Sequence, residues 1–186
     1  APLILGFDTT AAHCAAGLLC GGRVLAVAHE ERARGQAERL MPLLTEMMDG
    51  AGVASGDLAA IGVGTGPGNF TGTRLAVATA RGLALSLGIP AVGVTGLEAQ
   101  ALGAPGPALA SLDARQGRLY VQGFGCPPDA PQLLSVDALA EADLPRGLAC
   151  MGDHAAALAA ATGGHVATPA HPLAEAIARI AAARHE

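Results

Sequence analysis

A short apolar run that ends in a carboxylate, followed by a turn and a second apolar run, occurs twice in this chain. The first copy begins at residues 3–8 and the second at residues 108–113. Runs of this length between turn residues are typical of buried strands. In the first copy, further apolar runs at 12–19 and 24–30 flank a Gly-Gly pair that suits a tight hairpin, so three antiparallel strands are expected. The repetition indicates a duplicated α/β unit.

The best candidate for the boundary between the two copies is the segment 103–107, Gly-Ala-Pro-Gly-Pro, because glycine and proline interrupt regular structure. We therefore predict two lobes, residues 1–103 and 104–186, each with a mixed sheet flanked by helices. The remaining elements expected from apolar spacing are helices at 36–51, 71–87, 97–102, 155–161 and 173–184, and strands at 61–64, 89–94, 119–124, 132–136 and 148–152.

Pro42 falls within the first of these helical segments. Proline is tolerated in the first turn of a helix, where its missing N–H has no intrahelical partner to lose. The regular helix is therefore expected to begin near Arg39 or Leu40.

The charge of the chain limits the chemistry that it can perform. Its formal net charge is −5 and all 11 basic residues are arginines, so no lysine is present for a phosphate-binding loop, a Schiff base or a general base. Nucleic-acid affinity depends largely on basic groups that neutralise phosphates, which argues against direct tight binding of nucleic acid. If RNA is involved, we expect a partner to hold it.

The apolar residues, 51% of the chain, supply a core but predict no membrane contact. They form no run near the roughly 18 consecutive apolar residues that a spanning helix needs. The first residues lack the basic region of a signal peptide, so a cytoplasmic protein is expected. The four cysteines include no Cys-x-x-Cys pair and are expected to be small buried thiols: Cys14, Cys20, Cys126 and Cys150.

A glycine-rich segment, residues 64–72, joins the strand 61–64 to the second long helix. Glycine at such a junction permits positive φ and close approach of the backbone, and the N-terminus of the following helix can bind an anion. The segment lacks the Gly-Lys-Ser/Thr of a phosphate-binding loop and does not fit the dinucleotide pattern Gly-x-Gly-x-x-Gly. From these residues alone, a structural turn and a binding loop both stay open.

The same segment carries a resemblance to a known family. Residues 66–74, Gly-Pro-Gly-Asn-Phe-Thr-Gly-Thr-Arg, resemble the Gly-Pro-Gly-x-Phe-Thr-Gly-x-Arg signature of the TsaB family. Similar stretches follow the family's order at 4–10, 38–42, 82–84, 93–97 and 113–120. The resemblance is strong over about residues 3 to 125 and looser beyond them, and the chain looks short at its C-terminus beside the family.

This resemblance implies an α/β, actin-like ATPase (ribonuclease H-like) fold and a role in the synthesis of tRNA threonylcarbamoyladenosine. The family is a paralogue of TsaD, the subunit that transfers the threonylcarbamoyl group to adenosine 37 of tRNA. By resemblance, the chain is expected to be a non-catalytic scaffold or activator that binds TsaD and, with it, the ATPase TsaE. The alternative is a stand-alone ATP- or metal-dependent enzyme of the actin-like or putative glycoprotease superfamily.

The positions of the metal site in TsaD-like proteins favour the non-catalytic alternative. Those proteins carry His-x-x-x-His after the last strand of the first lobe, and alignment on residues 93–95 places the two histidines at Gly96 and Gln100. Glycine has no ligand atom, and an amide is a poor ligand for a transition metal. No metal ligand is predicted, and the six histidines are expected to lie on the surface or to form local hydrogen bonds.

In the fold that this chain resembles, ATP lies between the lobes and a glycine-rich hairpin from each lobe holds its phosphates. Asp8, Thr9 and Thr10 in the first hairpin suit either a residual nucleotide contact or a vestigial polar turn, since the glycine is missing. The second hairpin, 111–117, lacks the paired glycines that close on an anion. No cofactor is expected to bind independently, and ATP or ADP only in the complex with TsaD and TsaE.

The first two long helices carry more apolar surface than their own core requires. At about 100° per residue, the apolar positions from Leu40 to Ala51 spread over roughly 160°, against about 100° for a core-facing stripe, and Met41 and Met48 form the extra edge. The apolar residues of the second helix point all round it, which predicts cover on both sides. A fully internal helix and a helix shared with a partner are both compatible with this pattern.

The resemblance favours the shared helix, because in the family these two helices form a four-helix bundle with the equivalent pair of TsaD, or a homodimer when TsaD is absent. Arg74 and Arg81 lie seven residues apart and are expected at the rim, opposite carboxylates. An unrelated homodimeric binding module is a third alternative. The predicted partner-binding residues are Arg39, Leu40, Met41, Leu44, Met48, Phe70, Arg74, Val77, Ala78 and Arg81.

Overall fold

The computed structural model describes residues 1–185, which divide into two compact units. The first unit comprises residues 1–95 and the C-terminal segment that begins at Pro172, and the second comprises Gly96–His171. These bounds differ from the predicted 1–103 and 104–186, because the helix after residue 95 belongs to the second unit and the terminal helix α5 (Leu173–His185) to the first. The spacing within a helix does not reveal which sheet it packs on, so local pattern misplaced both helices.

Five strands form the sheet of the first unit, in the order β3-β2-β1-β4-β5. Their bounds are Leu3–Asp8 (β1), His13–Cys20 (β2), Arg23–Glu31 (β3), Leu58–Gly64 (β4) and Ala91–Val94 (β5). The first three strands are antiparallel, as predicted, and β4 and β5 add in parallel. Gly21 and Gly22 close the β2–β3 hairpin with φ of 53° and 82°, the positive values that this two-residue turn requires.

The sheet of the second unit repeats this topology. Its strands are Ala108–Arg115 (β6), Arg118–Phe124 (β7), Gln132–Ser135 (β8), Ala149–Gly152 (β9) and His165–Val166 (β10). Their order, β10-β9-β6-β7-β8, is the order of the first sheet when it is followed from β8, and the parallel and antiparallel pairs correspond. The predicted duplication of an α/β unit is confirmed, although β10 was missed because two residues give no periodicity.

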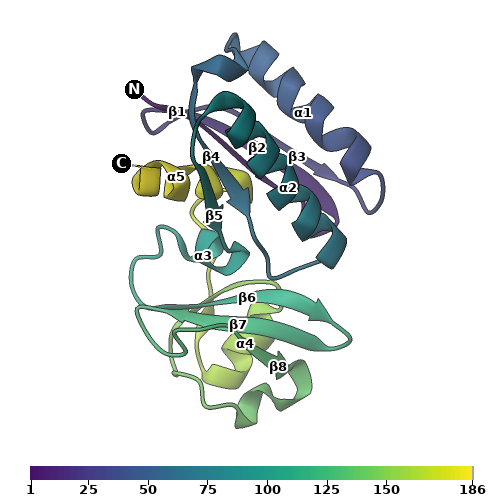
Figure 1. The fold of residues 1–186 in the computed structure, drawn as a ribbon. Coiled ribbons are helices and arrows are strands. Elements are labelled where there is room, and N and C mark those ends of the chain that lie inside the picture. The colour runs from purple at the N-terminus through teal and green to yellow at the C-terminus, as the bar shows by residue number, and fades with distance from the viewer. Residues whose placement is uncertain (186) are drawn as a thin grey trace. The chain divides into compact units, whose positions relative to one another are not determined.

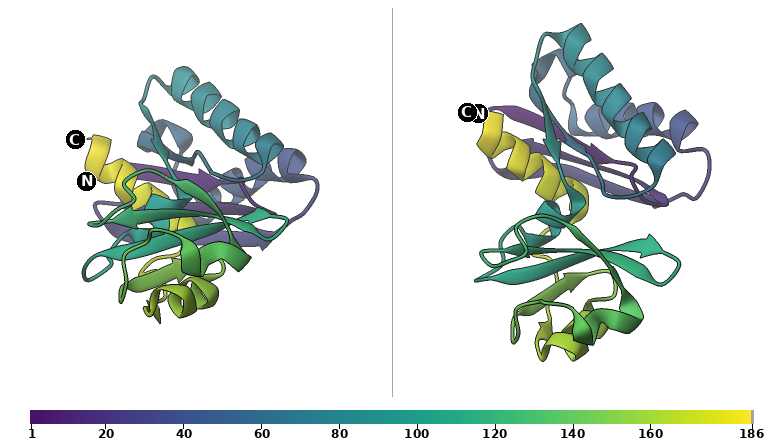
Figure 2. Two further views of the ribbon diagram at one scale, coloured as in Figure 1. Left: turned by 90° about the horizontal axis from the view of Figure 1, so that it is seen from below. Right: turned by 60° about the horizontal axis from the view of Figure 1, so that its bottom comes forward.

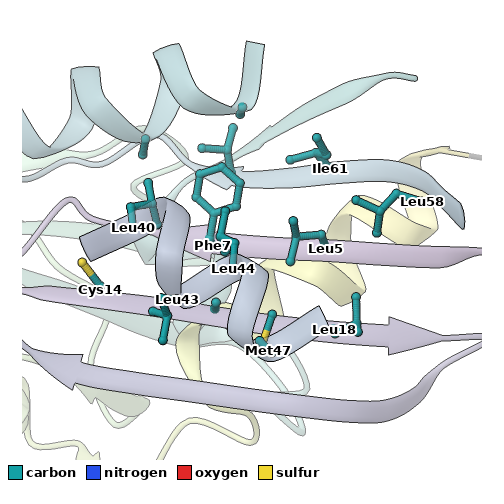
Figure 3. Packing of buried hydrophobic residues seen from close by; sticks show 14 of the residues in the cluster. Leu5, Phe7, Cys14, Leu18, Leu40, Leu43, Leu44, Met47, Leu58 and Ile61 are labelled. Atoms are coloured by element: carbon teal, nitrogen blue, oxygen red, sulfur yellow. The ribbon is translucent and has the colours of Figure 1, made fainter. Parts of the chain in front are cut away.

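Helices cover both faces of the first sheet (Figures 1 and 2). α1 (Gln36–Ala51) and α2 (Phe70–Leu87) pack on one face, and α5 packs on the other. Side chains alternate along β1, so Leu5 and Phe7 lie in the core under α1 and α2 (Figure 3), whereas Ile4 packs with Ala178 of α5. The first unit is therefore a three-layer arrangement with α1 and α2 side by side on one surface.

Helix α1 begins at Gln36, earlier than predicted, and Pro42 lies inside it rather than in its first turn. Proline cannot donate the bond that would run to the carbonyl of Glu38. Pro42 is exposed, so water has access to the helix there and one missing bond does not end it.

The second unit has a smaller core of its own. α4 (Ala155–Thr162) and the short helix η2 (Val136–Glu141) close over apolar residues of β6, β7 and β9, and α3 (Gly96–Ala101) contacts the same three strands. A further short helix, η1 (Ser55–Asp57), precedes β4 in the first unit. None of the helices in residues 1–185 combines the length and apolar content that crossing a bilayer requires.

Candidate functional site

Helix α2 has one buried side and one exposed apolar side. Ala76, Ala80 and Ala84 are buried against the sheet, as the small side chains of a closely packed helix. On the opposite side Leu85 is 86% exposed and Phe70 is 68% exposed. Burying a side chain of this size is worth about 1.5–3 kcal/mol, so leaving both in water is a cost that a covering surface would remove.

A shallow groove lies beside the last turns of α2, on the side of β5. Its lining is mostly small and apolar: Ala78, Arg81, Gly82, Ala84, Leu85, Gly88, Ile89 and Ala91. Small residues allow another element to approach closely, and the separation of packed helices is set by the side chains at their contact. Of the predicted partner-binding residues, Ala78 and Arg81 lie in this groove and are exposed, while Val77 is half-buried.

The first turn of α2 presents an aromatic ring under a cation. Asn69 caps the helix, since its side-chain oxygen accepts the N–H of Gly72 at 3.0 Å. One turn later, the guanidinium carbon of Arg74 lies 3.8 Å from the centroid of the Phe70 ring, a cation–π contact worth about 0.5–1 kcal/mol on a surface. The two predicted residues thus hold each other in place on the exposed side of the helix.

Helix α1 contributes less to this surface than predicted. Leu40 and Leu44 are fully buried between α1 and the sheet (Figure 3), which corrects their assignment to a partner surface. Residues four apart lie on one side of a helix, and here that side faces the core. Met41 is 43% exposed, and Met48 is half-buried at the edge of the core.

Arg39, also predicted to bind a partner, is engaged within the first unit. Its guanidinium donates to the carboxylate of Glu30 on β3 at 2.6 Å and to that of Glu46 on α1 at 2.8 Å. These bonds hold the pKa of both carboxyl groups below their ordinary value, and they raise the pKa of Arg39. Arg39 therefore ties α1 to the edge strand β3 in this chain.

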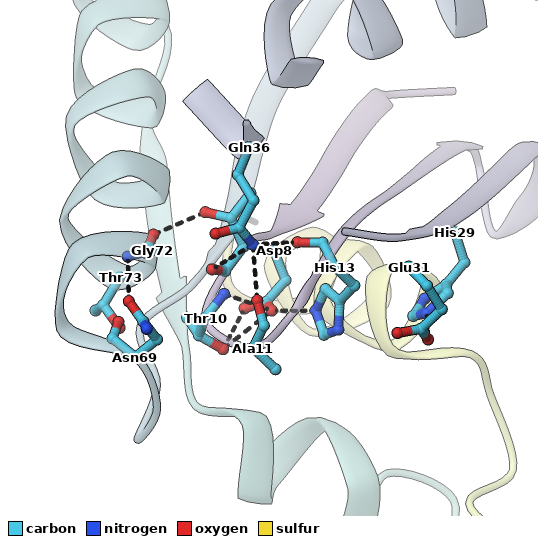
Figure 4. Close-up of polar contacts among 11 residues, drawn as sticks. Asp8, Thr10, Ala11, His13, His29, Glu31, Gln36, Asn69, Gly72 and Thr73 are labelled. Carbon is cyan, nitrogen blue, oxygen red and sulfur yellow. Dashed lines mark hydrogen bonds and ion pairs between the residues drawn. The ribbon is translucent and has the colours of Figure 1, made fainter. Parts of the chain in front are cut away.

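The β1–β2 hairpin carries polar side chains that bond to one another (Figure 4). Asp8 and Thr9 are fully buried and Thr10 is 6% exposed. The Asp8 carboxylate accepts the N–H and the hydroxyl of Thr10, each at 3.0 Å, and lies 2.6 Å from Nε2 of His13. The Thr9 hydroxyl donates to the carbonyl of Gly72 at 2.7 Å. These groups are satisfied within the first unit, and the residual nucleotide contact at Asp8, Thr9 and Thr10 stays a prediction.

The glycine-rich segment packs directly on this hairpin. A Cβ at Gly72 would lie 1.9 Å from the carbonyl oxygen of Thr9, and one at Gly68 would lie 2.3 Å from that of Thr10. The N–H of Asn69 donates to the Thr10 carbonyl at 2.6 Å. Of the two alternatives for this segment, the contact gives these glycines a structural role, since any side chain would separate the two backbones.

In the second unit, residues near the β6–β7 hairpin form hydrogen bonds with other residues of the same unit. Residues 115–117 all have positive φ and form its turn. The N–H of Asp113 donates to the Asp153 carboxylate at 2.9 Å, and the Asp113 carboxylate lies 3.2 Å from Nε2 of His154. His154, like His13, forms a local hydrogen bond, as predicted for the histidines.

The two positions that the resemblance aligned with the predicted metal site lie in α3. Gly96 is its first residue, and Gln100 follows one turn later with its side-chain oxygen buried. Over residues 1–185, no group of three or more His, Cys, Asp or Glu side chains is arranged to hold a metal ion.

The cysteines behave as small core residues. Cys14 and Cys150 are buried, and burial raises the pKa of each thiol because it disfavours the thiolate. Cys20 and Cys126 are half-buried, and all four are free.

Gln36 holds the β1–β2 hairpin in place, and no pattern in the sequence predicted this role. Its side-chain Nε2 lies 3.2, 2.7 and 2.6 Å from the carbonyl oxygens of Thr9, Ala11 and His13 (Figure 4). A single glutamine forms no motif, and the carbonyls that it reaches lie in another part of the chain. Only its position as the first residue of a predicted helix marked it at all.

Comparison with known proteins identifies relatives of the chain. The family model TsaD, described as tRNA N6-adenosine threonylcarbamoyltransferase, matches residues 26–125. A protein of Escherichia coli K12 named tRNA threonylcarbamoyladenosine biosynthesis protein TsaB is 36% identical over 123 residues, which are 63% of this chain and 52% of that protein. The chain thus spans about half the length of the curated relatives that it matches.

Solved structures agree with this relationship. A Pseudomonas aeruginosa protein described as similar to the peptidase YEAZ superposes with a TM-score of 0.81 at 26% identity, over 100% of this chain and 94% of that chain. Component A of the (R)-2-hydroxyglutaryl-CoA dehydratase of Acidaminococcus fermentans gives a TM-score of 0.60 at 13% identity, over 100% and 99% of the chains, and so shares the fold alone. The predicted resemblance to TsaB and the predicted actin-like α/β fold are confirmed.

Proposed function

This chain belongs to the TsaD family, and from that membership we propose that it acts in the synthesis of tRNA threonylcarbamoyladenosine as a non-catalytic subunit that binds TsaD. Its similarity to a protein named for that biosynthesis supports the pathway. The proposed role is to hold TsaD in a productive complex and, with it, to recruit TsaE.

The exposed side of α2 is the observation that carries this proposal. Phe70 is exposed at the first turn of the helix, and Leu85 is exposed near its last turn, where it lines the groove together with Ala78 and Gly82. An exposed apolar surface of this kind, flanked by charged residues, is typical of a protein interface. Arg81 supplies the positive rim that carboxylates of a partner would meet.

The absence of catalysis in this subunit is supported by the residues that stand at catalytic positions. Gly96 and Gln100 replace two imidazoles, and neither is a good ligand for a transition metal. The polar groups of Asp8, Thr9 and Thr10 are bonded to the chain itself. We therefore propose that no nucleotide binds to the isolated chain, and that ATP or ADP enters only with TsaD and TsaE.

We propose further that the same α2 surface forms a homodimer when TsaD is absent. With a net charge of −5 and no lysine, the chain offers little to RNA phosphates, so tRNA is assigned to the partner.

Size-exclusion chromatography with light scattering tests the central proposal. The chain mixed with TsaD at micromolar concentration should elute as a heterodimer, and the homodimer should disappear as TsaD is added. Separate elution of the two proteins at every concentration tried would contradict the proposed role.

Calorimetric ATP titration and metal analysis of the isolated chain test the alternative of a stand-alone enzyme. We expect no ATP binding at micromolar concentration and no stoichiometric metal. Either one, together with turnover by the chain alone, would favour the enzyme.

A further inference from the structure

Helix α2, which carries the candidate partner surface, and its neighbour α1 both begin beside the β1–β2 hairpin (Figure 4). Gln36 is the first residue of α1, and Phe70–Gly72 form the first turn of α2. Hydrogen bonds run from each of these helix starts to the hairpin backbone or side chains. The hairpin is therefore the common support of both helices.

On the α1 side, the side-chain amide of Gln36 makes the connection to the turn. Nε2 of Gln36 reaches the carbonyls of Thr9, Ala11 and His13, with the shortest distance, 2.6 Å, to His13. Thr9 and Ala11 lie in the turn and His13 is the first residue of β2, so the amide fixes the shape of the turn together with the start of the helix. An amide N–H₂ supplies only two hydrogens, and the three oxygens share them.

On the α2 side, the connection is made by backbone groups and one hydroxyl. The N–H of Asn69 donates to the Thr10 carbonyl at 2.6 Å, and the Thr9 hydroxyl donates to the Gly72 carbonyl at 2.7 Å. The contact is close enough that a Cβ on Gly72 would meet the Thr9 carbonyl, and it would also lie 3.5 Å from Oε1 of Gln36. Thr9 and Gln36 thus lie at the point where the hairpin and both helix starts meet.

The hairpin is held in one conformation from its other side as well. The buried Asp8 carboxylate accepts the N–H and hydroxyl of Thr10 and pairs with His13. A displacement of Thr9 or Thr10 therefore has to break buried bonds, each of which is expensive to leave unmade.

We propose that residues Asp8–His13 form a coupling element, through which the starts of α1 and α2 move together, and that Gln36 and Thr9 are positioning residues for the partner surface. In its consequence for partner binding this inference rests on the proposed function. Because coupling between two sites is reciprocal, a partner bound to α2 stabilises the hairpin, and loosening the hairpin weakens the partner's binding.

Hydrogen exchange on the free chain tests the coupling without any partner. Thr9→Val removes the hydroxyl that bonds to Gly72 and nearly preserves the volume of the side chain. We expect amide exchange to rise about five-fold or more in the first turn of α2 and also in the first turn of α1, since a net hydrogen bond is worth about a factor of five in an equilibrium. Exchange in α5 should stay unchanged.

Gln36→Leu removes the amide that bonds to the hairpin carbonyls from the α1 side. If the two helix starts are coupled, this substitution should also raise amide hydrogen exchange at Gly72 and Thr73 of α2. The matched control is Thr162→Val, which removes a buried hydroxyl bond to the carbonyl of Leu158 in the second unit and should leave both helix starts as in the parent chain. If Thr9→Val affects α2 alone and Gln36→Leu affects α1 alone, the coupling proposal is overturned. Should Gln36→Leu fail to fold, the Thr9→Val measurement still decides.

A binding measurement separates this inference from the proposed function. If the parent chain does not bind TsaD, the proposed function fails while the exchange result stands. If the parent chain binds, Thr9→Val should weaken binding about five-fold although Thr9 is buried, and Thr162→Val should not. Unchanged affinity of Thr9→Val would overturn the link between the hairpin and the partner surface.

Discussion

At the scale of single residues, two glycines of α2 have different roles: one permits a close backbone contact, and the other faces open space. Gly72 is required because its Cα faces the carbonyl of Thr9 at a distance that admits no side chain. Gly82, ten residues later in the same helix, has open space where a Cβ would be. The first glycine makes the contact with the hairpin, and the second only leaves the exposed groove without a side chain.

Replacing each of these glycines by alanine should therefore change stability in opposite directions. Gly72→Ala forces the hairpin and helix apart and should lower the free energy of unfolding by about 1–3 kcal/mol. Gly82→Ala, the matched control, should raise it by about 0.5–1 kcal/mol, because alanine loses less entropy in a helix interior. Urea unfolding monitored by circular dichroism measures both values, and a loss of stability with Gly82→Ala would show that the groove is not open.

At the scale of elements, one side of α2 packs on the sheet and the other side is exposed. The buried side consists of alanines that let the helix lie close to the sheet. The exposed side carries Leu85 and Phe70, whose side chains are 86% and 68% exposed. Stability and partner binding should therefore be separable on this one element.

Leu85→Glu should abolish binding to TsaD and leave stability within about 0.5 kcal/mol of the parent, since it alters only the exposed side. Leu133→Glu is the control: Leu133 is 47% exposed on β8 of the second unit, and its replacement should leave binding intact. Titration calorimetry gives the affinities. Full affinity of the Leu85→Glu chain would place the interface elsewhere.

The ion pairs of Arg39 give α1 and β3 a connection that depends on pH. The folded-state pKa values of Glu30 and Glu46 lie below their ordinary value of 4.5, so the stabilisation is complete above that pH and is lost as the pH falls through the lowered values. Arg39→Met should lower the free energy of unfolding at neutral pH, and its difference from the parent should shrink as the pH drops below about 4.5. Denaturant titrations across this range measure it.

Arg34→Met is the control for this titration, because Arg34 is an exposed arginine of the loop before α1. Its difference from the parent should show no such step below the ordinary carboxyl pKa. A constant difference for Arg39→Met down to the most acidic pH would mean that Arg39 acts by packing alone.

At the scale of the whole molecule, the chain consists of two copies of one topology, completed in different ways. The first sheet receives α5 from the far end of the sequence, and Gly6, Gly17 and Gly62 allow α5 to lie directly on the strands. The second unit, Gly96–His171, is one continuous segment with its own core. The two units therefore depend differently on the last residues of the chain.

Ending the chain after His171 should unfold the first unit and spare the second. Removal of α5 exposes Ile4, Leu19 and Ala60, which form a core cluster with it. Hydrogen exchange should show loss of protection in β1 and β4 with retained protection in β6 and β7. Retained protection throughout would mean that α5 is dispensable for the first sheet.

The local elements and their repetition could be predicted from the order of the residues alone. Apolar runs ending in Asp8 and Asp113, the Gly21-Gly22 turn and the spacing of α1 and α2 depend on neighbours in the chain, so their pattern is visible without a structure. The family signature at residues 66–74 likewise lies in one continuous stretch. For these features the determining contacts are local, and the prediction of the fold was correct.

Other features became visible only in the folded chain. These are the sheet that α5 covers and the burial of Leu40 and Leu44 in the core. The bonds by which Gln36 and Thr9 join the hairpin to two helices are a further example. An apolar side chain on a helix has the same pattern whether a core or a partner covers it. The bonds of Gln36 and Thr9 join residues that are distant in the sequence, and which distant group a polar side chain meets is set by the packing of the whole unit.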